Sequence, residues 1–158
     1  VGQGDGIYLC TSGGTSMFID GGSTDVKQVG KYRILPFLKA KGVSEISYWF
    51  VSHTDTDHVS GLKEVLVSGY RVEYLVFAKA VEKEAKTKEL AELARSHGTK
   101  VFYMQAGDTV RSKRAAMRCL YPKASDKAED VNDLCLVLQK VEESSQLNEI
   151  NFGDFEGL

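Results

Sequence analysis

The apolar run at residues 46–51, ISYWFV, restricts the possible folds of this chain more than any other feature. Its length and aromatic content are typical of a β-strand that is buried on both faces. The run ends at Ser52 and passes directly into a polar loop that contains two histidines and two aspartates. Functional sites in α/β proteins usually lie in loops that follow such strands. We therefore expect an α/β fold with a site after this strand.

The rest of the chain alternates between strand and helix patterns. A hairpin is expected around residues 12–15, and a short helix at residues 34–38 is expected to end before Gly42. Two more helices are predicted, one from Leu62 to Gly69 and an amphipathic one over residues 82–97. The further strands are predicted at residues 74–78, 100–104, 115–121, 134–141 and 150–152, with a loop at 123–130. This order predicts the α/β class with a mixed sheet.

Composition excludes several classes of protein. The chain has 158 residues and is 42% hydrophobic, which suits one globular domain rather than a disordered chain. Its net charge of −2 is distributed unevenly. Residues 1–70 carry a net charge of −1, residues 71–127 of +6 and residues 128–158 of −7. The basic excess is typical of a solvated helix face or of a phosphate-binding strip. No membrane span and no secretory signal is predicted.

The three cysteines, Cys10, Cys119 and Cys135, are widely spaced and odd in number. This pattern indicates neither a disulfide framework nor a zinc ribbon, so no disulfide partner is expected.

The loop after residues 46–51 carries the donor groups of a metal site. His53, Asp55, Asp57 and His58 offer two imidazoles and two carboxylates, which suit Zn²⁺, Mn²⁺ or Fe²⁺. The first three lie two residues apart and can point to one side of an extended segment, while His58 begins a tighter turn. This spacing suits two metals, and a pair roughly 3.5–4 Å apart can hold a bridging hydroxide as nucleophile. The alternative is a loop that only caps the next helix, with Asp57 or Ser60 as the N-cap.

The motif His53-x-Asp55-x-Asp57-His58 resembles the H-x-[HD]-x-D-H signature of the metallo-β-lactamase fold in its Asp-for-His form. Further segments resemble the C-terminal hydrolase-like domain of the ComEC competence proteins. They are VGQGDG at 1–6, FIDGG at 18–22, ILPFLK at 34–39, AGD at 106–108, LYP at 120–122, NDLCLVL at 132–138 and GD at 153–154.

The resemblance implies an αββα sandwich with mixed sheets. Residues 1–158 would form a single but partial domain, because the last signature histidine of the family should follow Asp154 by several tens of residues. At Cys135 the family pattern usually has serine. A chain without the last histidine is expected to bind metal weakly, at one site at best.

The resemblance also implies a role for each matched residue. His53 and Asp55 would bind a first metal, and Asp57 and His58 a second, with Asp57 also orienting the nucleophilic water. Asp154 would bridge the two metals. Asp5 and Asp20 would fix the orientation of the imidazoles, and Asn132 would position the substrate or a metal-bound water.

The function implied is a metal-dependent hydrolase with up to two Zn²⁺ or Mn²⁺ ions. It would be a phosphodiesterase that acts on single-stranded DNA during competence-related uptake, as the soluble domain of a bacterial inner-membrane channel protein. One alternative is a stand-alone cytoplasmic hydrolase of a small ester, lactone or thioester, and another is a non-catalytic scaffold. A DNA enzyme should have an open basic groove, whereas a small-molecule enzyme should have a lidded apolar pocket.

Overall fold

Two β-sheets form the framework of the computed structural model, which describes residues 4–142 of the chain. The five strands of the first sheet follow the chain in spatial order. They are β1 (Gly6–Cys10), β2 (Ser16–Asp20), β3 (Glu45–Phe50), β4 (Arg71–Ala78) and β5 (Lys100–Met104). β1 pairs with β2 in antiparallel fashion, and the other neighbours are parallel, so the sheet is mixed as predicted.

β3 lies at the centre of this sheet, between β2 and β4. Trp49 and Phe50 are both fully buried although they point to opposite faces. Residues 46–51 are therefore the doubly buried strand that their composition predicts.

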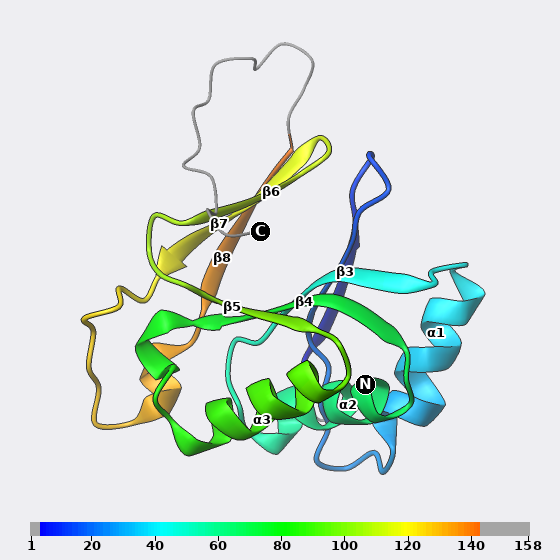
Figure 1. The fold of residues 1–158 in the computed structure, drawn as a ribbon, viewed down its shortest axis with the longest axis horizontal. Coiled ribbons are helices and arrows are strands. Elements are labelled where there is room, and N and C mark those ends of the chain that lie inside the picture. The colour runs from blue at the N-terminus through cyan, green and yellow to red at the C-terminus, as the bar shows by residue number, and fades with distance from the viewer. Residues whose placement is uncertain (1–3, 143–158) are drawn as a thin grey trace.

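Helices cover one face of the first sheet (Figure 1). In chain order they are the π-helical turn η1 (Gly30–Ile34), α1 (Leu35–Ala40), α2 (Thr56–Val67) and α3 (Ala85–Ser96). The 3₁₀ turn η2 (Lys79–Val81) between β4 and α3 packs instead on the other face of the sheet through Val81. Leu38, Leu62 and Leu90 come from the three α-helices and are buried against Trp49 and Leu75 of the sheet. Burial of this apolar face is the main stabilisation of the helical layer.

A second, antiparallel sheet packs on the other face of the first. Its strands are β6 (Thr109–Ser112), β7 (Ala115–Tyr121) and β8 (Val137–Glu142), with the 3₁₀ turn η3 (Val131–Leu134) before β8. Met17 and Phe50 of the first sheet meet Val110 and Met117 of the second in a separate apolar core. The described residues thus build a helical layer and two sheet layers of the predicted αββα sandwich (Figure 1).

The structure departs from the sequence prediction mainly at the start of α2. We expected this helix from Leu62, but it begins at Thr56, inside the polar loop. The buried positions of the helix already begin at Val59 and recur at Leu62, Val65 and Leu66, which is the helical period. The two-residue spacing of His53, Asp55 and Asp57 had suggested an extended segment, so the sequence prediction missed the start of this helix.

Two smaller departures concern strands of the second sheet. β6 was not predicted, because its sequence TVRS has one apolar residue and gains its structure from pairing with β7. β8 begins at Val137 rather than at residue 134, since Val131–Leu134 forms a 3₁₀ turn. The strand predicted at 150–152 lies outside the described residues.

Candidate metal centre

The candidate site lies at the carboxyl ends of β2 and β3, which are parallel neighbours. β2 ends at Asp20, and β3 leads through Ser52 into His53. Because the ends of parallel strands meet at one edge of a sheet, groups that are distant in sequence come together here. Asp20 has a backbone φ of 58°, a left-handed conformation that non-glycine residues rarely adopt.

Asp20 is buried, and both its carboxylate oxygens and its backbone carbonyl accept hydrogen bonds. Its Oδ1 accepts a hydrogen bond from the Ser52 backbone N–H at 2.8 Å, and its Oδ2 accepts one from the Ser52 hydroxyl. Its backbone carbonyl accepts a hydrogen bond of 2.7 Å from Trp49 Nε1. These contacts fix the carboxylate against β3 and explain how the strained backbone is maintained.

His58 is oriented by Asp20. Its Nδ1 lies 3.0 Å from Asp20 Oδ2, and a carboxylate only accepts, so Nδ1 carries the proton. The Nε2 lone pair of the neutral ring is then free, and it faces Asp57 Oδ2 at 3.6 Å. This is the arrangement found around metal-binding histidines, in which a second partner fixes the tautomer.

The electrostatic surroundings of His58 are negative. Burial acts against its protonation, but the hydrogen bond to Asp20 and the charges of Asp20, Asp57 and Asp5 together raise its pKa above the ordinary value. The position therefore favours a positive charge, whether a proton or a metal ion supplies it.

His53 and Asp55 form a second pair beside the first. The His53 ring is buried and meets the His58 ring edge-on, with centroids 5.5 Å apart. Its Nδ1 accepts a hydrogen bond of 3.1 Å from the Asp55 backbone N–H and lies 3.6 Å from Asp55 Oδ2. The Asp55 carboxylate also accepts a hydrogen bond of 2.7 Å from Lys86 Nζ of α3, which lowers the pKa of Asp55.

Glycines let the loop after β2 approach residues 52–58, the candidate metal loop, closely. A Cβ on Gly22 would lie 2.4 Å from the Thr56 carbonyl oxygen, and one on Gly61 would lie 2.0 Å from the Gly21 carbonyl oxygen. The first turns of α2 thus pack directly on the loop after β2. Only glycine permits this approach, which carries His58 to Asp20.

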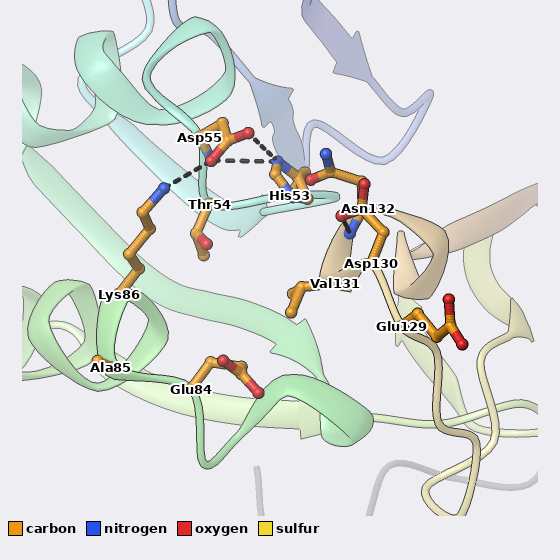
Figure 2. Close-up of a pocket in the computed structure, with 10 residues that line it drawn as sticks. All are labelled: His53, Thr54, Asp55, Glu84, Ala85, Lys86, Glu129, Asp130, Val131 and Asn132. Atoms are coloured by element: carbon orange, nitrogen blue, oxygen red, sulfur yellow. Dashed lines mark hydrogen bonds and ion pairs between the residues drawn. The ribbon is translucent and has the colours of Figure 1, made fainter.

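A cavity of about 620 Å³ opens beside His53 (Figure 2). Lys86 reaches into it from α3, and Asn132 lies close to His53. The carboxylates that line the cavity are Asp55, Glu84, Glu129 and Asp130. Four carboxylates and one lysine give it an acidic lining, so it is neither the basic groove expected of a nuclease nor a lidded apolar pocket.

The structure brings most of the predicted site residues together. His53, Asp55, Asp57, His58 and Asp20 lie around the ends of β2 and β3. Their geometry differs from the prediction, because Asp57 lies in the first turn of α2 and not in one extended segment with the two residues before it. Asp55 takes the N-cap position of that helix without a side-chain capping bond, so the alternative of Asp57 or Ser60 as the cap is wrong.

The remaining predicted residues are more peripheral. Asn132 lines the cavity, and its backbone N–H donates to Asp130 Oδ1 at 2.9 Å. Asp5 is exposed and influences His58 through its charge, while its backbone carbonyl accepts from the Gly21 N–H. Asp154 lies outside the described residues.

The donor set fits a divalent cation in type but is incomplete in number. Imidazole nitrogens and carboxylate oxygens suit Zn²⁺ or Mn²⁺. In the pair of His58 and Asp57, the separation of 3.6 Å between Nε2 and Oδ2 is close to that between two ligands of one metal ion, whereas the lone pair of His53 Nδ1 already accepts the Asp55 N–H. Within residues 4–142, however, no group of three or more His, Cys, Asp or Glu side chains is arranged to hold a metal ion.

Two residues at the site escaped prediction from the sequence. Ser52 holds Asp20 through both its N–H and its hydroxyl, and its position at the end of a buried strand was the available signal. Lys86 is 31 positions from its partner Asp55, and nothing local to it indicates that contact.

The cysteines and the helices add two further observations. Cys10, Cys119 and Cys135 are free thiols, and burial raises the pKa of Cys119 to about 11. Across the described part of the chain, no helix has the length and apolar character to cross a membrane.

Comparison with known proteins confirms the predicted resemblance. The chain is 28% identical to ComE operon protein 3 of Bacillus subtilis (strain 168) over 169 aligned positions, which cover 99% of this chain and 21% of that protein. The chain thus spans about a fifth of the length of this relative. No family model matches the chain.

A solved structure confirms the fold. A HARLDQ-motif mutant of a metallo-β-lactamase from Cronobacter sakazakii superposes with a TM-score of 0.51 at 16% identity, covering 73% of this chain and 46% of that one. By this superposition, the described layers belong to the metallo-β-lactamase fold. A HARLDQ-motif metallo-β-lactamase of the same species has a TM-score of 0.48 at 18% identity, with the same coverage.

Proposed function

We propose that this chain, which has the metallo-β-lactamase fold and resembles the ComEC competence proteins, is a metal-dependent hydrolase of phosphodiester bonds in single-stranded DNA. The observation that carries the hydrolase proposal is the contact of His58 Nδ1 with Asp20, which leaves Nε2 free beside Asp57. A histidine held in this way is prepared to bind a metal rather than to cap a helix.

The proposal assigns the metal to the two pairs of side chains. His58 and Asp57 would hold one Zn²⁺ or Mn²⁺, and His53 and Asp55 would hold a second. Such ions supply Lewis acidity toward a phosphoryl oxygen and lower the pKa of a bound water. Asp154, outside the described residues, is the proposed bridging ligand.

The chain's own residues would bind and orient the substrate. Lys86 projects into the cavity beside Asp55, where its ammonium group can contact a phosphate oxygen. Asn132 faces the same cavity with an amide group that can donate to a substrate oxygen. Asp57, with its carboxylate partly exposed, is positioned to accept a proton.

The acidic lining bears on the choice of substrate. Four carboxylates around one lysine would repel a polyanion, so phosphate would enter the cavity only after cations neutralise the lining. The proposal therefore requires that DNA cleavage depend strictly on the metal.

The biological setting belongs to the same proposal. ComE operon protein 3 carries a competence-operon name, and the match supports competence-related DNA uptake as the setting of this chain. The domain would work beside the DNA-conducting membrane channel of a longer parent protein of a bacterial inner membrane.

The test is hydrolysis by the purified chain with added Mn²⁺ or Zn²⁺. The substrates are a labelled single-stranded oligonucleotide, bis(p-nitrophenyl) phosphate and p-nitrophenyl acetate. We expect cleavage of the two phosphodiesters, a loss of about 100-fold or more in His58→Ala, and no change in the exposed-histidine control His97→Ala.

Two outcomes would contradict the proposal. Hydrolysis of the acetate ester with no phosphodiester cleavage would favour a small-ester hydrolase. Equal activity in wild type and His58→Ala, or no activity with any metal, would favour a scaffold.

A further inference from the structure

A second cavity, of about 570 Å³, lies on the helical face of the first sheet beside its edge strand β1. We name it the α1 groove. It is lined by Gly6, Tyr8, Phe18, Val26, Arg33, Ile34, Phe37 and Lys41. It shares no lining residue with the cavity beside His53.

The groove has an aromatic wall. Phe37 is 38% exposed and meets the Tyr8 ring edge-on at a centroid distance of 5.4 Å. The Tyr8 ring in turn lies 6.4 Å from that of Phe18. An exposed aromatic ring supported by other rings offers a flat face on which a planar group can stack.

The rim of the groove is basic. Residues 26–44 contain five lysines or arginines and no aspartate or glutamate. Arg33 and Lys41 line the groove, and neither forms an ion pair with another residue of the described part. Lys41 Nζ lies over one face of the Phe37 ring, 5.9 Å from its centre, so a base stacked on the ring would have this cation next to it.

Three acidic residues next to this segment have other partners. Asp25 Oδ1 accepts a hydrogen bond of 2.7 Å from the Ser23 hydroxyl. Glu64 Oε2 accepts the backbone N–H of Lys31 at 3.0 Å. Glu45 Oε2 is bonded to Arg71 Nε at 2.6 Å. The positive charge of Arg33 and Lys41 is therefore available for an anionic ligand.

Two lysines of the basic segment 71–127 differ from these, because each has an acidic partner. Lys79 pairs with Glu82, and Lys86 pairs with Asp55. Such pairs are typical of a solvated helix face, so the basic excess of residues 71–127 does not by itself mark a phosphate-binding surface.

We infer that the α1 groove binds single-stranded nucleic acid, with a base stacked on Phe37 and phosphates held by Arg33 and Lys41. Stacking faces next to unpaired cations are what sequence-tolerant single-strand binding requires. The inference takes its substrate class from the proposed function, but it concerns binding at a site separate from the metal loop.

The test is fluorescence anisotropy with a labelled oligothymidylate, in EDTA, so that no cleavage occurs. Phe37→Ala should weaken binding by about fivefold or more, because stacking of one base contributes about 1 kcal/mol or more. The same substitution should not change the affinity for an abasic oligonucleotide of equal length.

The double variant Arg33→Ala/Lys41→Ala tests the phosphate contacts. Loss of two contacts should reduce the slope of log K against log salt by about 1.4 between about 50 and 200 mM salt. The matched control Lys83→Ala/Lys88→Ala removes two exposed lysines, one just before α3 and one within it, and should leave affinity and slope unchanged.

Other results would overturn the inference. Equal losses in the groove and control variants would mean diffuse electrostatic attraction, and wild-type affinity in both groove variants would exclude the groove. Binding to phosphatidylglycerol vesicles without binding to the oligonucleotide would make the groove a membrane contact. His58→Ala should bind DNA normally, so failure of cleavage and failure of binding are separable.

Discussion

Replacing Asp20 by asparagine changes the charge of the group that holds His58 and hardly changes its shape. In the native protein Oδ1 accepts the Ser52 N–H, and Oδ2 faces the Ser52 hydroxyl and His58 Nδ1. An asparagine oxygen can keep the first bond, but its NH₂ group must then face the other two partners. The anionic acceptor is lost at a buried position.

The expected cost follows from these bonds. Hydrogen bonds to charged groups contribute roughly 1.5–3 kcal/mol. Part of this is recovered in the variant, because the serine hydroxyl can rotate and the imidazole can change tautomer, so that each accepts a hydrogen bond from the asparagine NH₂. The free energy of unfolding should therefore fall by about 2 kcal/mol. The control Asp126→Asn, in a loop where the carboxylate accepts one N–H from Lys123, should change it far less.

The same substitution should reverse the tautomer of His58. When the asparagine NH₂ donates to Nδ1, the proton of the neutral ring moves to Nε2, which then cannot bind a metal. The metal affinity should fall about 10- to 100-fold. Two-dimensional NMR of the imidazole nitrogens reads the tautomer directly, and a zinc titration reads the affinity.

The pH dependence of stability should change as well. Because the pKa of His58 is raised in the folded protein, its contribution to stability is complete below its unfolded pKa of about 6.5 and is lost as pH rises through the folded pKa. Asp20→Asn should remove most of this dependence in denaturant unfolding. An unchanged tautomer, together with an unchanged pH profile, would refute the assignment of Asp20 as the residue that orients His58.

Three other variants test packing and charge in α2 and α3. Gly61→Ala should lower the free energy of unfolding by about 3 kcal/mol in urea denaturation, because its Cβ would lie 2.0 Å from the Gly21 carbonyl oxygen; a gain in stability would contradict this. Thr87→Val should raise the free energy of unfolding by about 1 kcal/mol, since its buried hydroxyl has no hydrogen-bond partner among the described residues; a loss would show a partner. Lys86→Ala should raise the pKa of Asp55 toward its ordinary value in an NMR titration, so any stability from the ionised carboxylate, lost as pH falls, should weaken.

The sequence predicted those parts of the fold that depend on local pattern. β5 and β7 begin and end where their apolar periods do, and Gly98 ends the helical segment before β5 with a φ of 81°. The start of α2 was wrong because Asp55, Asp57 and their spacing suggested an extended loop. The helix is set instead by Val59 and the apolar residues after it, which pack on the sheet.

The candidate site was predictable where its residues are adjacent in sequence, and at Asp20 through the family resemblance. Ser52 and Lys86 were not predictable, because their roles arise when strand ends and the start of α3 meet in space. The basic segment at the α1 groove was not recognised from the sequence for a different reason. The five cations of residues 26–44 were cancelled by acidic residues in the total for residues 1–70.

The most informative measurement is a zinc titration of the isotope-labelled chain followed through its histidine side-chain signals. The chain has three histidines, and His97 is exposed at the end of α3, where it serves as an internal reference. We predict that the His53 and His58 signals shift together and that His58 binds through Nε2, while His97 does not change. Movement of His97 alone, or no shift of His58 at saturating zinc, would contradict a metal centre at this loop.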